Sequence, residues 1–210
     1  MLFQSQANAK FALGLYKSIE AEKGDGVNLF FSPASISVAL AMTYAGARNA
    51  TAAEMKTAMA LTDLEDGDLH AAFEDLHSAI TKPQSNYTMH VANKLFVEQK
   101  YSILQEFLDK TKSHYKAESV GVDFKTKFEE ARLMINKWVE DQTNSKIKDL
   151  LPKESLDELT RMVLVNAIYF KGDWELQFKK KPTLDKDFTL ASGAKVKTPM
   201  MFQKDKFPLG

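Results

Sequence analysis

The stretch "VLVNAIYFKGDW", residues 163–174, places an asparagine, Asn166, in a run that is otherwise almost wholly apolar. The apolar residues of this run do not alternate with polar ones. A strand of this kind is typical of the middle of a layered sheet, where both faces are covered. A buried amide that is left unpaired costs roughly 1 to 3 kcal/mol. We therefore expect a central strand here and hydrogen-bond partners for Asn166.

The N-terminal part of the chain has the residue patterns of helices. Apolar residues at four-residue spacing predict an amphipathic helix over residues 7–21. "NLFFSP" (28–33) predicts a short apolar strand. Ser32 and Pro33 supply an N-cap and a first-turn proline for a helix of small residues, "ASISVALAMTYAGA" (34–47). The many small side chains indicate close packing on several sides of this helix.

Two capping boxes predict further helix starts, one formed by Thr51 with Glu54 and one by Ser102 with Gln105. The other expected elements are a helix over 69–82, strands over 86–98 and 119–124, a helix over 128–142, and a hairpin over 187–203 with Gly193 in its turn. Many helices around a sheet with a doubly covered central strand predict an α+β fold.

Composition excludes several classes of function. The 28 basic and 28 acidic residues cancel, so no overall field favours nucleic acid or an anionic membrane as a partner. The absence of cysteine excludes disulfides, thiolate metal ligands and a cysteine nucleophile. No secretory leader and no apolar stretch of membrane-spanning length is recognisable. We expect a cytoplasmic protein, with the extracellular space as the alternative.

Sequence patterns of catalytic or metal sites are also missing. The four histidines lack metal-ligand spacing, so we expect no metal site and no cofactor. No nucleophile elbow, dinucleotide fingerprint or P-loop occurs. Asn49 and Asn86 each begin a glycosylation sequon, which is usable only if the chain is exported. The first sequon has the weaker case, because Thr51 is already expected to cap a helix.

Five blocks of sequence stand in an order that closely resembles the serpin family. The blocks are "NLFFSPASISVALAMTYAGARNATAAEM" (28–55), "ANKLFVEQ" (92–99), "INKWVEDQTNSKIKDLLP" (135–152), "VLVNAIYFKGDWELQF" (163–178) and "VKTPMMFQ" (196–203). The resemblance covers essentially the whole chain, and its leaderless start is similar to the ovalbumin-like branch. It implies the serpin fold, with helices packed around a large central β-sheet, and a single domain over residues 1–210.

The resemblance implies a function as well. Serpins are suicide inhibitors of serine proteases, and sometimes of cysteine proteases, whose cleaved reactive loop inserts as a new strand into the main sheet. By resemblance, Asn166 belongs with Ser32 and Ser35 to the "shutter" beneath the sheet, and Trp174 to the "breach", where the loop first enters. The alternative for Asn166 is a position at an edge or beside a buried water.

The sequence also departs from the family pattern. A complete serpin is nearly twice this length, so we expect an N-terminal portion that lacks the reactive bond and cannot trap a protease by itself. An open edge on the central strand would then favour self-association. The segment "LHAAFEDLHSAITK" (69–82) contains Glu74 and Asp75 but a single lysine, so heparin activation is doubtful. A non-inhibitory serpin and an unrelated enzyme or adaptor are the competing interpretations.

Overall fold

The computed structural model describes residues 2–24, 26–83, 85–179, 181 and 183–204. The chain divides into two compact units, Met1–Lys171 and Gly172–Gly210, and each is described by itself. A single domain over residues 1–210 therefore stays a prediction. None of the described helices is both long enough and apolar enough to cross a membrane.

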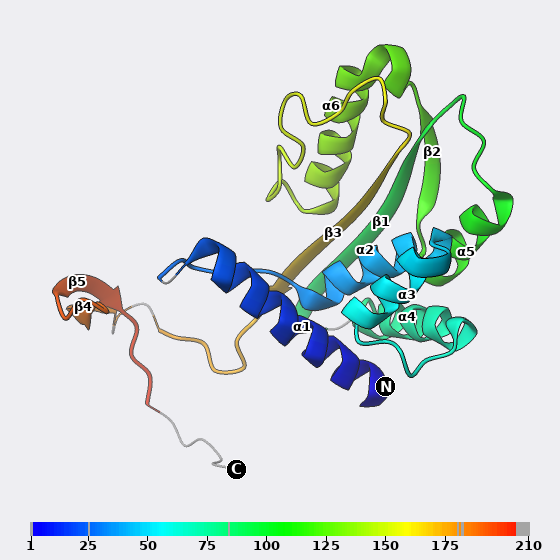
Figure 1. The fold of residues 1–210 in the computed structure, drawn as a ribbon. Coiled ribbons are helices and arrows are strands. Elements are labelled where there is room, and N and C mark those ends of the chain that lie inside the picture. Colours follow the sequence, from blue (N-terminus) through cyan, green and yellow to red (C-terminus); the bar gives the residue numbers. More distant parts are fainter. Residues whose placement is uncertain (1, 25, 84, 180, 182, 205–210) are drawn as a thin grey trace. The chain divides into compact units, whose positions relative to one another are not determined.

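The first unit contains most of the secondary structure, shown in Figure 1. Its elements in chain order are α1 (Leu2–Lys23), α2 (Pro33–Gly46), α3 (Asn49–Ala58), α4 (Asp66–Ile80), β1 (Tyr87–Glu98), α5 (Gln105–Tyr115), β2 (Glu118–Val122), α6 (Phe124–Gln142) and β3 (Met162–Gly172). The strands form a sheet of order β2-β1-β3. This mixture of helices with a sheet confirms the α+β prediction.

The neighbours of β1 run in different directions. β1 and β2 are parallel, with Leu95 opposite Ser119. Between β1 and β3, the amide of Glu98 donates to the carbonyl of Arg161, and the side chain of Asn166 bonds to that of Asn93. Residue numbers thus rise along β1 as they fall along β3, as in an antiparallel pair. Asn166 consequently lies beside Asn93.

Hydrophobic clusters cover both faces of the sheet. On one face, Leu95 belongs to a cluster with helices α1, α2, α4 and α5, and Leu164 of β3 packs against the same cluster. On the other face, Phe96, Val165 and Ala167 pack with α6. Figure 1 shows α6 on one side of the strands and the N-terminal helices on the other. The prediction that both faces of β3 are covered is therefore confirmed for its middle.

One predicted strand and both capping boxes are wrong. Residues 28–33 form no strand, because a strand needs a hydrogen-bonded neighbour and this segment has none within the described chain. α3 begins at Asn49 and α5 at Gln105, each without a side-chain cap. Thr51 therefore lies inside a helix, and Ser102 lies before one. Met55 and Phe107 pack against the core cluster, so both helices are held by tertiary packing although they lack side-chain caps.

The second unit is built around a hairpin, as predicted. β4 (Leu184–Thr189) and β5 (Lys195–Met200) are antiparallel, with Thr189 opposite Lys195. Gly193 in the turn has a φ of +82°, a conformation that glycine adopts without steric cost. The carboxylate of Asp187 lies 2.7 Å from the Lys197 ammonium across the two strands.

Candidate functional site

The start of α2 carries two serines, of which Ser35 contacts the sheet. Ser32 is the N-cap, and its hydroxyl oxygen accepts a hydrogen bond of 3.3 Å from the backbone N–H of Ser35. Pro33 follows in the first turn, where its missing N–H costs nothing. This confirms the predicted start of α2. It also fixes Ser35, which is buried, in the first turn of the helix.

Asn166 connects α2 to both central strands. The hydroxyl of Ser35 donates to the Oδ1 atom of Asn166, and the Nδ2 atom of Asn166 donates to Oδ1 of Asn93 at 2.7 Å. We call this chain of contacts the Ser35–Asn166–Asn93 link. Each hydrogen bond in the link joins a donor of one side chain to an acceptor of the next. The link ties the first turn of α2 to the middle of β3 and of β1.

The link continues from Asn93 to the end of α5. The Nδ2 atom of Asn93, a buried residue, donates to the backbone carbonyl oxygen of Tyr115 at 2.8 Å. Tyr115 is the last residue of α5, and Lys116 after it adopts a left-handed conformation with a φ of 53°. The helix therefore stops where its last carbonyl faces β1. An unpaired amide at this depth would cost about 1 to 3 kcal/mol.

The side chain of Tyr115 joins a second polar group between α4 and α5. Its hydroxyl lies 2.6 Å from Nδ1 of His70, which is buried. Burial lowers the pKa of His70 to about 4, with smaller contributions from the charges of Lys110 and His114. Burial also raises the pKa of Tyr115, so a protonated hydroxyl lies beside a neutral imidazole at pH 7.

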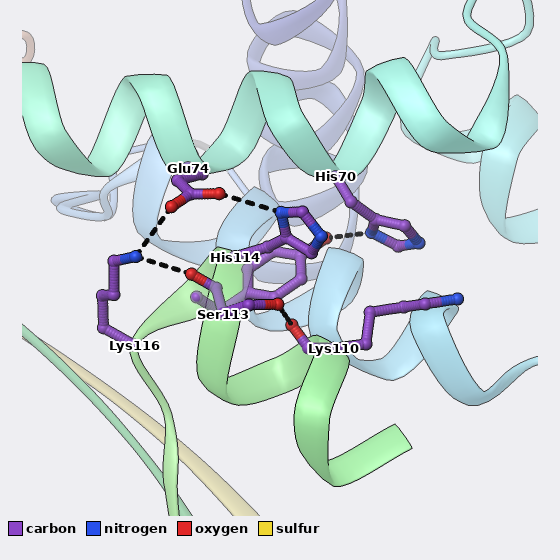
Figure 2. A network of polar contacts seen from close by, with 7 residues as sticks. His70, Glu74, Lys110, Ser113, His114 and Lys116 are labelled. Carbon is purple, nitrogen blue, oxygen red and sulfur yellow. Dashed lines mark hydrogen bonds and ion pairs between the residues drawn. The ribbon is translucent and has the colours of Figure 1, made fainter. Parts of the chain in front are cut away.

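Glu74 of α4 holds the outer part of this group together. Figure 2 shows its carboxylate between His114 and Lys116. One carboxylate oxygen lies 3.0 Å from Nδ1 of His114 and the other 2.8 Å from the Lys116 ammonium. The hydrogen bond from Lys116 is the main reason why the pKa of Glu74 is lowered. These contacts connect α4 to the C-terminal end of α5.

The structure brings some of the predicted site residues together. Ser32, Ser35 and Asn166 lie in one connected group. Trp174 belongs to the second unit, and its side chain is 73% exposed. Its assignment to the breach stays a prediction. Asn49 and Asn86, the two sequon asparagines, are both exposed.

Sequence reasoning missed Asn93, although a signal for it exists. The expected strand over 86–98 has Val91 and Leu95 on its inward face, and Asn93 lies between them with the same parity. A polar residue on an apolar strand face is the same feature that marked Asn166. Within the described residues, no cluster of three or more histidine, cysteine or acidic side chains could hold a metal ion.

Comparisons with known proteins identify the family. The model of the family "Serpin (serine protease inhibitor)" matches residues 6–210. Leukocyte elastase inhibitor from Bos taurus is 44% identical over 206 residues, which cover 98% of this chain and 54% of the relative. Serpin B6 from Bos taurus is 42% identical over 202 residues, covering 95% of this chain and 53% of the relative. The chain thus spans about half the length of these relatives.

Solved structures agree with this match. Emu ovalbumin (Dromaius novaehollandiae) superposes with a TM-score of 0.91 at 36% identity, covering 95% of this chain and 55% of the other. A structure titled "Cleaved Serpin 42Da" has a TM-score of 0.86 at 35% identity, covering 93% of this chain and 51% of the other. In fold and in sequence alike, the chain belongs to the serpin family and is similar to its ovalbumin-like members.

Proposed function

We propose that this chain is the N-terminal part of an inhibitor of serine-type endopeptidases that traps its target by inserting a cleaved loop into the central sheet. Family membership and the names of relatives such as leukocyte elastase inhibitor support this function. The observation that carries the proposal is the Ser35–Asn166–Asn93 link at the middle of β3. In this proposal the sheet must open beside β3 to accept a new strand, and the Ser35–Asn166–Asn93 link lies at the middle of that strand.

In this proposal, the new strand is added beside β3. Among the described strands, β3 is hydrogen-bonded to β1 alone, so its other edge is the place where a strand can pair. Making room there requires β3 to move relative to the helix beneath it. Ser35 and Asn166 hold these two elements together, so breaking their hydrogen bond forms part of the barrier to insertion. Ser32 fixes the position of Ser35 and acts through it.

The test is the formation of a covalent complex. The whole protein, purified from the cells that produce it, is mixed with leukocyte elastase. The products are separated under denaturing conditions, and their masses are measured by intact mass spectrometry. We expect a stable complex that contains both proteins. Elastase whose active-site serine is blocked should give none. Complete cleavage of the protein, with full protease activity left and no complex for a panel of serine proteases, would contradict inhibition.

The size of the whole protein is a separate test. An antibody against residues 1–30 isolates it, and intact mass spectrometry measures it. The chain described here has a mass of 23.6 kDa and spans about half of its relatives, so we expect about twice that mass. A whole protein of 23.6 kDa would exclude inhibition by loop insertion for this chain. A partner or regulatory role would then replace it.

The proposal also covers the target, the self-association and the location of the protein. The target is a serine protease or, as in some serpins, a cysteine protease. The exposed edge of β3 and exposed apolar side chains near its end, such as Phe170, favour self-association when the edge is not covered. We place the protein in the cytoplasm. A non-inhibitory serpin remains the alternative, and the complex-formation test separates the two.

A further inference from the structure

The first unit contains an apolar pocket that does not involve the Ser35–Asn166–Asn93 link. Its volume is about 440 Å³, and it lies between the end of α2, the start of α3, residues 101–104 and the first turns of α5. Most of the lining side chains are apolar, among them Met55, Ile103, Phe107 and Met162. A pocket of this size and lining is within the range of small-molecule sites in proteins.

Glycine at position 46 forms one wall of the pocket. A Cβ atom added to Gly46 would lie 3.0 Å from the ring of Phe107, closer than carbon atoms normally approach. The missing side chain therefore lets Phe107 of α5 pack directly against the end of α2. Phe107 also contacts the main core cluster. This wall is consequently fixed by packing rather than by a mobile loop.

Two cationic side chains line the same pocket. The Nη1 atom of Arg48 donates to the carbonyl oxygens of Ala45, at 3.3 Å, and of Ala47, at 2.8 Å. These bonds hold the guanidinium at the end of α2. The Lys110 ammonium is 3.8 Å from the carboxylate of Glu106, whose side chain is 74% exposed. The charged lining residues, Arg48, Lys110 and Glu106, thus carry a net charge of +1.

Hydroxyl side chains add to the polar part of the lining. Thr51 and Ser102, which the sequence assigned to helix caps, both line the pocket. Neither α3 nor α5 has a side-chain cap, so these hydroxyls are not used in that role. The pocket therefore combines an apolar interior with a small set of donors from different elements. Such a combination recognises a molecule with an apolar body and an anionic end.

We propose that this pocket binds an amphipathic carboxylate, a medium-chain fatty acid or a molecule of similar chemistry. The apolar chain would fill the space beside Ile103, Phe107 and Met55, and the carboxylate would pair with Arg48 and Lys110. We propose an acid and not a neutral lipid because the charges are complementary. The guanidinium of Arg48 is a planar donor group that suits a carboxylate. This inference does not depend on protease inhibition.

Decanoate is the probe for the test. It is titrated into the whole protein by calorimetry, and decanoate labelled with ¹³C at the carboxyl group reports the environment of the acid by NMR. We expect decanoate to bind and decanol to bind at least tenfold more weakly. Arg48→Gln and Lys110→Gln should each weaken decanoate binding about tenfold, which corresponds to the loss of one charged hydrogen bond. Lys112→Gln is the matched control, because Lys112 is exposed on α5 and does not line the pocket.

A second variant tests the location of binding. Ile103→Trp fills the pocket without changing its charge, and circular dichroism checks that the variant is folded. We expect it to abolish decanoate binding. Equal affinity for decanol and decanoate, or unchanged binding in Ile103→Trp, would overturn the proposal. Absence of decanoate binding in the whole protein would also overturn it.

Discussion

Asn166 and Asn93 are amide side chains on strand faces that are otherwise apolar. Each uses its oxygen as an acceptor and its nitrogen as a donor, so the pair connects the hydroxyl of Ser35 to the carbonyl of Tyr115 without an unpaired group. Hydrogen bonds of this kind add modestly to stability when complete and cost much more when one partner is missing. The two residues should therefore act as a unit.

A double-mutant cycle tests this unit. Asn166→Ala leaves the Ser35 hydroxyl and the Asn93 carbonyl oxygen without their partner. Asn93→Ala leaves the Tyr115 carbonyl oxygen and the Nδ2 group of Asn166 without theirs. We expect each variant to lose about 1 to 3 kcal/mol of unfolding free energy. The double variant should lose at least 0.5 kcal/mol less than the sum, because the shared bond is removed only once. Urea unfolding of the whole protein measures all four forms, and strict additivity would contradict the direct bond.

His70 predicts a dependence of stability on pH. Its pKa is lowered from 6.5 to about 4, mainly by burial, so the folded protein keeps the imidazole neutral. Below pH 6.5 this imidazole is protonated in the unfolded chain but stays neutral in the folded chain. The free energy of unfolding must therefore fall as pH falls from about 6.5 towards 4, and this contribution is fully present above pH 6.5. The pKa of His77 is lowered by burial as well and acts in the same direction.

Urea unfolding at pH 7 and at pH 5.5 checks this prediction. The pKa values of Asp66 and Glu74 are lowered, so these two carboxylates stay ionised over this interval. We expect His70→Gln to reduce the loss of stability by on the order of 1 kcal/mol, because glutamine does not titrate. An equal loss in the variant and in the wild type would show that His70 does not contribute.

At the scale of single elements, a buried carboxylate anchors α6. Glu98 ends β1 and is only 5% exposed. One of its oxygens accepts from the backbone N–H groups of Phe124, at 2.8 Å, and Lys125, at 3.2 Å. The other accepts from the N–H of Lys100 at 3.2 Å. A negative charge at a helix start is favourable, so Glu98 fixes the helix that covers one face of the sheet.

Glu98→Gln tests this anchor. Glutamine keeps one acceptor but places an NH₂ group against a backbone donor, so we expect a loss of about 2 to 3 kcal/mol in unfolding free energy. Asp123→Ala is the control: it removes the half-buried N-cap of the same helix, with an expected cost of about 1 kcal/mol. Urea unfolding compares the two variants. A loss for Glu98→Gln no larger than for Asp123→Ala would contradict the anchoring role.

Elements whose cause is local were predictable from the sequence. The N-cap Ser32 and Pro33 gave the start of α2, and the turn glycine Gly193 gave the hairpin. The starts of α3 and α5 were not predictable from the capping boxes, because neither helix has a side-chain cap and both are held by packing of residues such as Met55 and Phe107 against the core. In the site, the family resemblance led us to expect Asn166 over the start of α2, and the structure shows its contact with Ser35. Their assignment to the shutter stays a prediction. The contact to Tyr115 was not predictable, because a backbone carbonyl leaves no signal in the sequence.

At the scale of the whole molecule, charge sets the expectation for heparin. The chain has no net charge, and α4 carries Asp66, Asp68, Glu74 and Asp75. We expect the whole protein to elute from immobilised heparin at or below about 0.15 M NaCl, because weak exposed contacts are screened at physiological ionic strength. Conductivity at the elution peak measures this. Retention well above that salt concentration would reveal a basic surface and would contradict the expectation.

Hydrophobic clusters cover both faces of the sheet of the first unit, and one edge of β3 has no strand beside it in the described part of the chain. Clusters on both faces hold β3 in the middle, yet β1 is its only strand neighbour in the described part of the chain. The proposed function needs this combination, since a strand can join at the edge only if β3 can part from α2 in a controlled way. The central claim is therefore that Asn166 holds β3 to the elements around it.

Hydrogen exchange of β3 amides in the whole protein tests this claim most directly. Mass spectrometry of peptides covering 162–172 compares the wild type with Asn166→Ala and with Asn28→Ala, whose asparagine is exposed. We predict that Asn166→Ala speeds exchange in β3 roughly tenfold, in line with a loss of about 1.4 kcal/mol in local opening free energy, while Asn28→Ala leaves it unchanged. Equal exchange in all three proteins would contradict the claim.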